Sequence, residues 1–134
     1  LQLGNGGTTG TIASTAAVVN NGNLIFNRSG TQTAGYAISG NGTVSKIGTS
    51  TLTLTGNSTY TGATTISAGT LQIGNGGTSG SIAGTVSVTN NAALIYNRSD
   101  ALSVPYSVSG SGSLSQSGTG TTTLTANNSY SGQT

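Results

Sequence analysis

The sequence predicts an all-β fold, a parallel β-helix in which the chain winds through about six short coils. Three observations lead to this prediction. Short apolar runs alternate with Thr, Ser and Gln, and clusters of Gly and Asn separate the runs. Position n matches position n+70 without a gap from Leu1/Leu71 to Thr64/Thr134, with 34 identities in the 64 pairs. The apolar runs also recur at irregular steps of about 20 residues, which is enough chain for three short strands and three turns.

The first copy of the repeat predicts five strands before its central stretch. We expect them at residues 1–3, 12–19, 24–26, 36–38 and 44–47. The strand at 12–19 is weak, because its apolar residues are small and interrupted. Gly and Asn end most of these runs, and both residues tolerate the left-handed backbone angles that sharp corners need.

The central stretch, residues 48–77, reads GTSTLTLTGNSTYTGATTISAGTLQIGNGG. Residues 51–55 alternate hydroxyl and isobutyl side chains, which is the period of a half-buried strand. Two more strands are expected at 63–66 and 70–73, with Gly-rich and Asn-rich turns between them. The second copy repeats this pattern with conservative changes, except in segments 29–35 and 99–105, which we expect to be loops or edge segments.

The repeat divides the chain into two units, residues 1–70 and 71–134, within one continuous solenoid domain. In such a domain each unit buries its apolar face on its neighbour, and each full unit would form about three coils. The main alternative is an antiparallel sandwich, which has turns at similar spacing. A sandwich has no reason to repeat through its whole length, so the repeat favours the solenoid.

The composition narrows the function. The charged residues are Arg28, Arg98, Lys46 and Asp100, and the chain contains no His, Cys or Glu. Acid–base pairs, nucleophilic triads and metal clusters all need partners that are missing, so we expect no enzyme activity, no catalytic residues, no cofactor and no metal site. With a net charge of +2, the chain has too few cationic side chains to neutralise the phosphate backbone of a nucleic acid, so we do not expect it to bind one. The sequence contains no run of about 20 apolar residues, so we expect no membrane-spanning helix in it.

Two pairs of repeat-related residues could contact a ligand. Arg28 and Arg98 could form a spaced basic pair for an anionic glycan, or they could be solubilising charges at strand ends. Tyr36 and Tyr106 could stack on sugars, although covering the edges of coils is the more ordinary role for them.

Rows of threonine hydroxyls suggest an alternative function, a flat face that binds ice or a glycan. The rows are Thr51, Thr53 and Thr55 in the first copy and Thr121, Thr123 and Thr125 in the second. An ice-binding face would need Thr-x-Thr in every coil on one side, whereas here the pattern recurs only once per repeat. The sequence therefore favours a structural stalk with no local ligand.

The central stretch resembles the passenger-associated transport repeat of bacterial autotransporters, also called the autotransporter-associated β-strand repeat. The residues that carry the resemblance are Leu52, Leu54, Gly56, Asn57, Tyr60, Gly62, Thr64, Thr65, Ile66, Ala68, Gly69, Thr70, Leu71 and Gly74. A second, degraded start appears at Leu124, Asn127, Tyr130 and Gly132, with Thr122 and Ala126 in place of the expected Leu and Gly.

The resemblance implies a right-handed β-helix passenger, here a fragment of a longer array, that reaches the bacterial surface or is secreted after passing through the periplasm. It implies that the parent chain's own C-terminal outer-membrane β-barrel is a partner, that the repeat aids secretion and folding, and that the parent is an adhesin with a host-surface or cell–cell adhesion partner. Exposed end coils further predict end-to-end self-association of the fragment.

Overall fold

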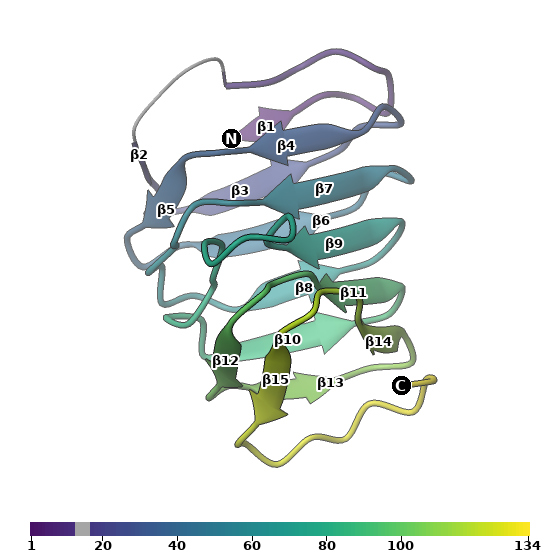
Figure 1. Cartoon of the computed structure of the whole chain (residues 1–134). Coiled ribbons are helices and arrows are strands. Elements are labelled where there is room, and N and C mark those ends of the chain that lie inside the picture. The colour runs from purple at the N-terminus through teal and green to yellow at the C-terminus, as the bar shows by residue number, and fades with distance from the viewer. Residues whose placement is uncertain (13–16) are drawn as a thin grey trace.

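The computed structural model describes residues 1–12 and 17–134, and these residues form fifteen short strands and no helix. Every strand pairing among them is parallel. Figure 1 shows the strands stacked in layers along one axis, with β1 near one end and the C-terminus at the other. The predicted parallel β-helix is therefore confirmed, and the antiparallel sandwich is excluded.

The strands form three sides, which the chain visits in a constant order. The first side is a six-stranded sheet, the second is a five-stranded sheet, and the third carries two separate two-stranded sheets. The first side consists of β1 (Gln2–Leu3), β3 (Asn23–Phe26), β6 (Thr43–Lys46), β8 (Thr64–Ile66), β10 (Ser87–Asn90) and β13 (Ser107–Ser109). The second side consists of β4 (Gln32–Ala34), β7 (Thr51–Leu54), β9 (Thr70–Ile73), β11 (Ala93–Tyr96) and β14 (Ser113–Gln116). The third side consists of β2 (Ala17–Val19), β5 (Ala37–Ser39), β12 (Ala101–Val104) and β15 (Thr121–Leu124).

The register along the first side shows how the chain advances from coil to coil. Each step from one partner to the next is one coil, and the successive partners are Gln2, Ile25, Ser45, Thr65, Thr89 and Ser109. Three hydrogen bonds that join neighbouring coils, Asn20 to Thr43, Ile38 to Ser58 and Ser45 to Asn23, span 20 to 23 positions of sequence, which agrees with the spacing of the apolar runs. The chain therefore makes about six coils, as predicted.

The sequence repeat does not coincide with a whole number of coils. Leu24 lies on the first side and its counterpart Leu94 on the second, while Thr53 lies on the second side and Thr123 on the third. Three coils take the chain from Gln2 to Thr65 on the first side. The repeat, however, ends at Gln72, which is the counterpart of Gln2. The residues between Thr65 and Gln72 carry the chain on to the second side. The expectation of about three coils per repeat holds approximately: the repeat makes three coils and one further side.

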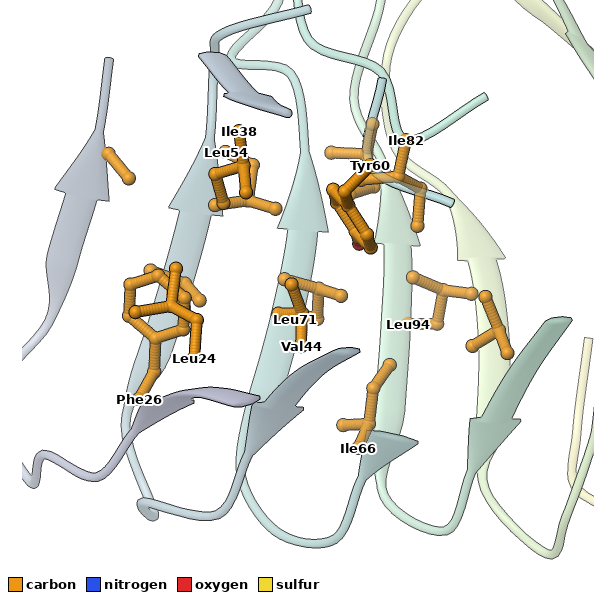
Figure 2. Close-up of a cluster of buried hydrophobic side chains, with 14 of the residues drawn as sticks. Leu24, Phe26, Ile38, Val44, Leu54, Tyr60, Ile66, Leu71, Ile82 and Leu94 are labelled. Atoms are coloured by element: carbon orange, nitrogen blue, oxygen red, sulfur yellow. The ribbon is translucent and has the colours of Figure 1, made fainter. Parts of the chain in front are cut away.

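The interior is one continuous apolar column that runs through the described coils. The inward positions of the alternating strands fill it, as Figure 2 shows for a cluster that includes Leu24, Val44, Leu71 and Leu94. Its members are Leu3, Leu24, Phe26, Ala34, Tyr36, Ile38, Val44, Leu52, Leu54, Tyr60, Ile66, Leu71, Ile73, Ile82, Val88, Leu94, Tyr96, Val104, Tyr106, Val108 and Leu114. Burial of the apolar surface of these side chains is the main contribution that favours folding, because the chain has few large apolar side chains outside this column.

Paired asparagines build the corners, as the Asn-rich turns predict. The side chain of Asn20 accepts a hydrogen bond from Gly22 N at 3.2 Å and donates one to Thr43 O of the next coil at 2.9 Å. Asn90 makes the same two bonds one repeat later, to Ala92 N and Ser113 O. Each corner is thereby closed within its own coil and tied to the following one.

The predicted strand positions hold with small shifts. The segments 29–35 and 99–105 contain β4 and β12, and each of these is an edge strand, which was one of the two alternatives. Part of the weak strand expected at 12–19 lies outside the described residues, and β2 begins at Ala17.

Candidate functional site

The described residues offer no obvious site for a small ligand. No pocket is found among residues 1–12 and 17–134, and the same residues contain no group of three or more His, Cys, Asp or Glu. Within the described chain, no helix has the length and apolarity needed to cross a membrane. The candidate functional site is therefore the surface through which one coil contacts the next, and the repeat motif at residues 52–71 forms the best-defined part of it. We call this segment the stacking junction.

The apolar residues of the stacking junction close the interior. Leu52, Leu54, Tyr60, Ile66 and Leu71 are each at most 1% exposed. Figure 2 shows several of them among the packed side chains of neighbouring coils. A ligand in solution could not reach side chains that are buried to this extent, so their role is packing.

A hydroxyl chain accompanies the buried Tyr60. Its hydroxyl lies 2.7 Å from Thr64 Oγ1, which lies 3.1 Å from Thr85 Oγ1, and Thr85 donates to Gly62 O at 2.7 Å. Burial raises the pKa of Tyr60 to about 12, although the Thr64 hydrogen bond opposes this shift. The tyrosine is therefore neutral and hydrogen-bonded at physiological pH, and it links two successive coils through threonines.

Three glycines of the stacking junction lie directly on the backbone of the preceding coil. A Cβ atom would be 2.3 Å from Tyr36 O at Gly56, 2.2 Å from Gly42 O at Gly62, and 2.4 Å from Ser50 O at Gly69. Any side chain at these positions would push the coils apart, because such contacts are far below van der Waals distance. The motif glycines are therefore needed for close stacking.

Polar groups of the stacking junction bond the coils on both sides of it. Ser58 Oγ accepts a hydrogen bond from Ile38 N of the preceding coil at 3.1 Å. Ser58 N donates one to Ser81 O of the following coil at 2.8 Å. Asn57 Oδ1 accepts from Gly80 N at 3.0 Å. The motif thus works as a two-sided connector between the preceding coil and the following one.

Arg28 and Arg98 fasten surface loops of the preceding coil. Arg98 donates to Gly80 O at 2.7 Å and to Thr78 O at 2.6 Å, and its guanidinium also pairs with Asp100 at 2.6 Å. Arg28 donates to the equivalent carbonyls of the first copy, which belong to residues 10 and 8. Both guanidinium groups are engaged with loop carbonyls, a role that neither of the two predictions for these arginines, a basic pair for a glycan or solubilising charges, included.

Asp100 strengthens the second of these arginine clamps. The hydrogen bond from Arg98 holds the pKa of the Asp100 carboxyl below its usual value, so the pair contributes stability above pH about 4 that is lost as the pH falls through the lowered pKa. Gly30 occupies the equivalent position in the first copy, and Arg28 Nε is buried there without a hydrogen-bond partner.

Tyr36 and Tyr106 lie in the interior, where they cannot stack on sugars and do not cover the edges of coils. Each is 5% exposed. The Tyr106 hydroxyl lies 3.0 Å from that of Tyr96, whereas the Tyr36 hydroxyl has no partner. The difference follows from one substitution, because Phe26 stands where the second copy has Tyr96.

The two threonine rows do not share a face. Thr51 and Thr53 belong to β7 on the second side, whereas Thr121 and Thr123 belong to β15 on the third. Thr53 is also buried at 6% exposure. One repeat therefore turns the row by one side, and no face of the described coils carries both rows.

Sequence reasoning assigned no role to Lys46, which the structure places in a buried corner. Lys46 is 2% exposed and donates to Gly48 O and, at 3.2 Å, to Ala68 O of the next coil. Burial lowers its pKa. The repeat contained a signal for this role, because the counterpart of Lys46 is the uncharged Gln116. Gln116 donates to Gly118 O in the same way, so the property that both residues share is a hydrogen-bond donor and not a charge.

Comparison with known families matches two segments of the chain, residues 44–73 and 109–134, to the passenger-associated transport repeat. The matches cover about two fifths of the chain, and the first contains the whole stacking junction. Searches of curated proteins and of solved structures each found no match.

Proposed function

We propose that this chain is a segment of an autotransporter passenger, and that it forms a rigid stalk whose repeats promote stepwise folding during secretion. The two matches to the passenger-associated transport repeat support this proposal. The repeat family implies a secreted or surface-exposed protein. In this proposal the stalk holds the adhesive part of the parent protein away from the cell, and it binds no ligand of its own.

The observation that carries the proposal is the two-sided bonding of the stacking junction. Its backbone and its Asn57 and Ser58 side chains bond the neighbouring coils, and its glycines bring those coils into direct contact. A solenoid built in this way gains stability from each nearest-neighbour contact, so it resists bending along its length. Such a rod suits a spacer better than it suits a binding module that needs a concave surface.

The same contacts suit folding in the direction of export. Successive strands of one side belong to consecutive coils, so each new coil needs only the coil before it as a template. A chain that emerges through the parent's outer-membrane β-barrel could therefore fold one coil at a time outside the cell. Each added coil would hinder backward movement, because returning would expose its buried apolar residues.

A non-enzymatic role agrees with the placement of the reactive groups. Asp100 is the only carboxylate side chain in the sequence, and it pairs with Arg98. The buried tyrosines carry raised pKa values, which disfavour their anionic forms. Among the described residues, no nucleophile has an adjacent base, so a scaffold is the function that these groups support best.

The test compares two glycine variants in the full-length parent protein with its own outer-membrane barrel. Gly62→Ala places a Cβ atom against the preceding coil, whereas Gly77→Ala adds one in open space. We expect Gly62→Ala to lower the amount of protease-accessible passenger on intact cells and Gly77→Ala to leave it unchanged. If Gly62→Ala lowers only the thermal stability of the purified chain and not its display, the role in secretion is wrong.

A further inference from the structure

The sequence contains four Asn-Gly pairs, at residues 5–6, 21–22, 41–42 and 75–76. Asn-Gly is the dipeptide most prone to spontaneous deamidation, because glycine has no Cβ atom to hinder its backbone nitrogen. We propose that Asn21 is the deamidation site of the folded chain, and that the stacking of the coils protects the other three asparagines. This inference does not depend on the proposed role in secretion.

Deamidation of an Asn-Gly pair needs the backbone nitrogen of the glycine to be free. That nitrogen attacks Cγ of the asparagine, so a new N–Cγ bond forms and the Cγ–Nδ2 bond breaks. Nδ2 leaves as ammonia and takes the proton that the backbone nitrogen loses. Water then opens the cyclic imide at either of its carbonyls, which gives aspartate or isoaspartate. A glycine N–H that donates a hydrogen bond must give up that bond before it attacks, so the reaction is slowed.

Three of the four glycine nitrogens donate to a backbone carbonyl of a neighbouring coil. These bonds are Gly6 N to Asn27 O at 2.9 Å, Gly42 N to Asn20 O at 2.8 Å and Gly76 N to Asn97 O at 2.8 Å. Each of them joins two stacked coils, so the N–H is released only when the coils separate locally. Exposure does not distinguish the four pairs, because all four asparagines are exposed.

Gly22 is the exception, because its nitrogen donates to a side chain of its own coil. The acceptor is Asn20 Oδ1 at 3.2 Å. The Asn20 side chain also donates to Thr43 O at 2.9 Å, so its rotation breaks two side-chain hydrogen bonds and leaves the backbone bonds between the coils in place. Gly22 N is therefore released by a smaller motion than the separation of two coils.

The second copy shows that this arrangement belongs to the corner itself. Ala92 is the counterpart of Gly22, and its nitrogen donates to Asn90 Oδ1 at the same distance of 3.2 Å, although a complete coil precedes it. Gly112 N donates to Asn90 O at 2.8 Å, which repeats the protected bond of Gly42. Both corners thus hold this nitrogen through a side chain, and only the first corner combines it with an Asn-Gly pair.

Modification of Asn21 would weaken the corner between β2 and β3. Asn21 Oδ1 accepts from Asn41 N at 3.3 Å, and Gly22 O accepts from Thr43 N at 2.8 Å, so both residues tie this corner to the next coil. Aspartate would keep the side-chain acceptor and add a second carboxylate side chain to a chain that has one. Isoaspartate would insert an extra carbon atom into the backbone and displace Gly22 O from its donor.

Peptide mapping tests the proposed site. The folded chain is incubated in mildly alkaline buffer and digested with trypsin, and mass-spectrometric fragmentation locates each deamidated residue. Cleavage after Arg28, Lys46 and Arg98 places residues 5 and 21 on one peptide, residue 41 on the next and residue 75 on a third. We expect Asn21 to deamidate at least about fivefold faster than the other three asparagines, because their glycine nitrogens must first lose a bond between coils.

The same incubation in urea is the control for the fold. All four pairs should deamidate there at similar rates, because no coil protects them. Equal rates at all four sites in the folded chain would overturn the proposal. A preference for Asn21 of the same size in urea would also overturn it, since the fold would then not be the cause.

Ala92→Gly tests whether the corner is sufficient to make a reactive site. This variant creates an Asn-Gly pair at Asn91, where the nitrogen again faces Asn90 Oδ1 and a complete coil precedes the corner. We expect Asn91 to deamidate at least about fivefold faster than Asn75, which lies on the same tryptic peptide. Circular dichroism should show that the variant is folded. A folded variant in which Asn91 reacts as slowly as Asn75 would overturn the proposal.

Gly22→Ala is the reciprocal variant, because it introduces the residue that the second copy carries at this corner. Its methyl group hinders the attacking nitrogen, so deamidation at Asn21 should fall at least about fivefold while the rates at the other three pairs stay unchanged. An unchanged rate at Asn21 would show that Gly22 N is not the attacking group and would overturn the proposal.

Discussion

Replacing Phe26 with Tyr should stabilise the chain, because it would supply the hydrogen-bond partner that the Tyr36 hydroxyl lacks. Tyr36 is 5% exposed and its hydroxyl makes no hydrogen bond. In the second copy the equivalent hydroxyls, those of Tyr96 and Tyr106, lie 3.0 Å apart. The repeat thus shows what the first copy is missing.

The expected magnitude follows from the cost of the isolated hydroxyl. A buried polar group without a partner costs about 1–3 kcal/mol, and a new hydrogen bond contributes about 0.5–1.5 kcal/mol net. Some of this gain is offset, because Phe26 is 1% exposed and the added oxygen must fit a packed interior. We therefore expect Phe26→Tyr to raise the free energy of unfolding by about 1 kcal/mol, or the melting temperature by about 4 °C.

A double-mutant cycle isolates the pairwise interaction. Urea denaturation followed by circular dichroism would be measured for Phe26→Tyr, Tyr36→Phe and the combination. Tyr36→Phe should be neutral or stabilising in the natural chain, because it removes an unsatisfied hydroxyl, and destabilising in the Phe26→Tyr background. Tyr96→Phe is the reverse experiment and should cost about 1–3 kcal/mol, because it leaves the Tyr106 hydroxyl unpaired. Zero coupling between positions 26 and 36 would refute the reasoning.

Three further predictions concern stacking, a buried cation and alkaline pH. Gly62→Ala should lower the free energy of unfolding by about 1–3 kcal/mol, because its Cβ would lie 2.2 Å from a carbonyl oxygen of the preceding coil, and Gly77→Ala should change it little; equal urea midpoints would contradict this. Lys46→Gln should keep the free energy of unfolding within about 1 kcal/mol, whereas Lys46→Met should lower it by about 1–3 kcal/mol, because two carbonyl oxygens lose their donor. Burial raises the pKa of Tyr60 and Tyr96 to about 12, so their contribution to stability is present below pH about 10 and is lost as the pH rises toward 12. Tyrosinate absorbance should therefore rise together with the loss of β-sheet circular dichroism, and an earlier rise would argue that these rings are accessible.

The architecture was predictable because the inward and outward positions of a strand alternate in the sequence itself. Leu52 and Leu54 separated by Thr53 predict a buried face, and the recurrence of this pattern one repeat later predicts a stack of similar units. The motif glycines were also visible, although the reason for each one, such as Gly62 against Gly42 O, requires the position of the neighbouring coil.

The roles of the charged residues were not predictable from local patterns. Arg28, Arg98 and Lys46 bond carbonyl groups that belong to other coils, 18 to 22 residues away. The distance between a side chain and such a carbonyl depends on how many residues each intervening corner and loop takes up. A charge in a polar sequence otherwise predicts a solvated surface, so these three residues were expected to be exposed or were given no role.

By itself, the sequence predicted that strands stack in parallel around a thin apolar interior, because alternation combined with a gapless repeat favours a solenoid over an antiparallel sandwich. Only the tertiary structure decided how the repeat is phased around that interior. The coils of the first side differ in length, and one full repeat ends one side beyond three coils, so equivalent side chains lie on adjacent sides. The physical reason is that the number of residues in a coil depends on how many its corners and loops take up, and this number varies from coil to coil. The 70-residue repeat can be read from the sequence, but the number of coils that it makes cannot.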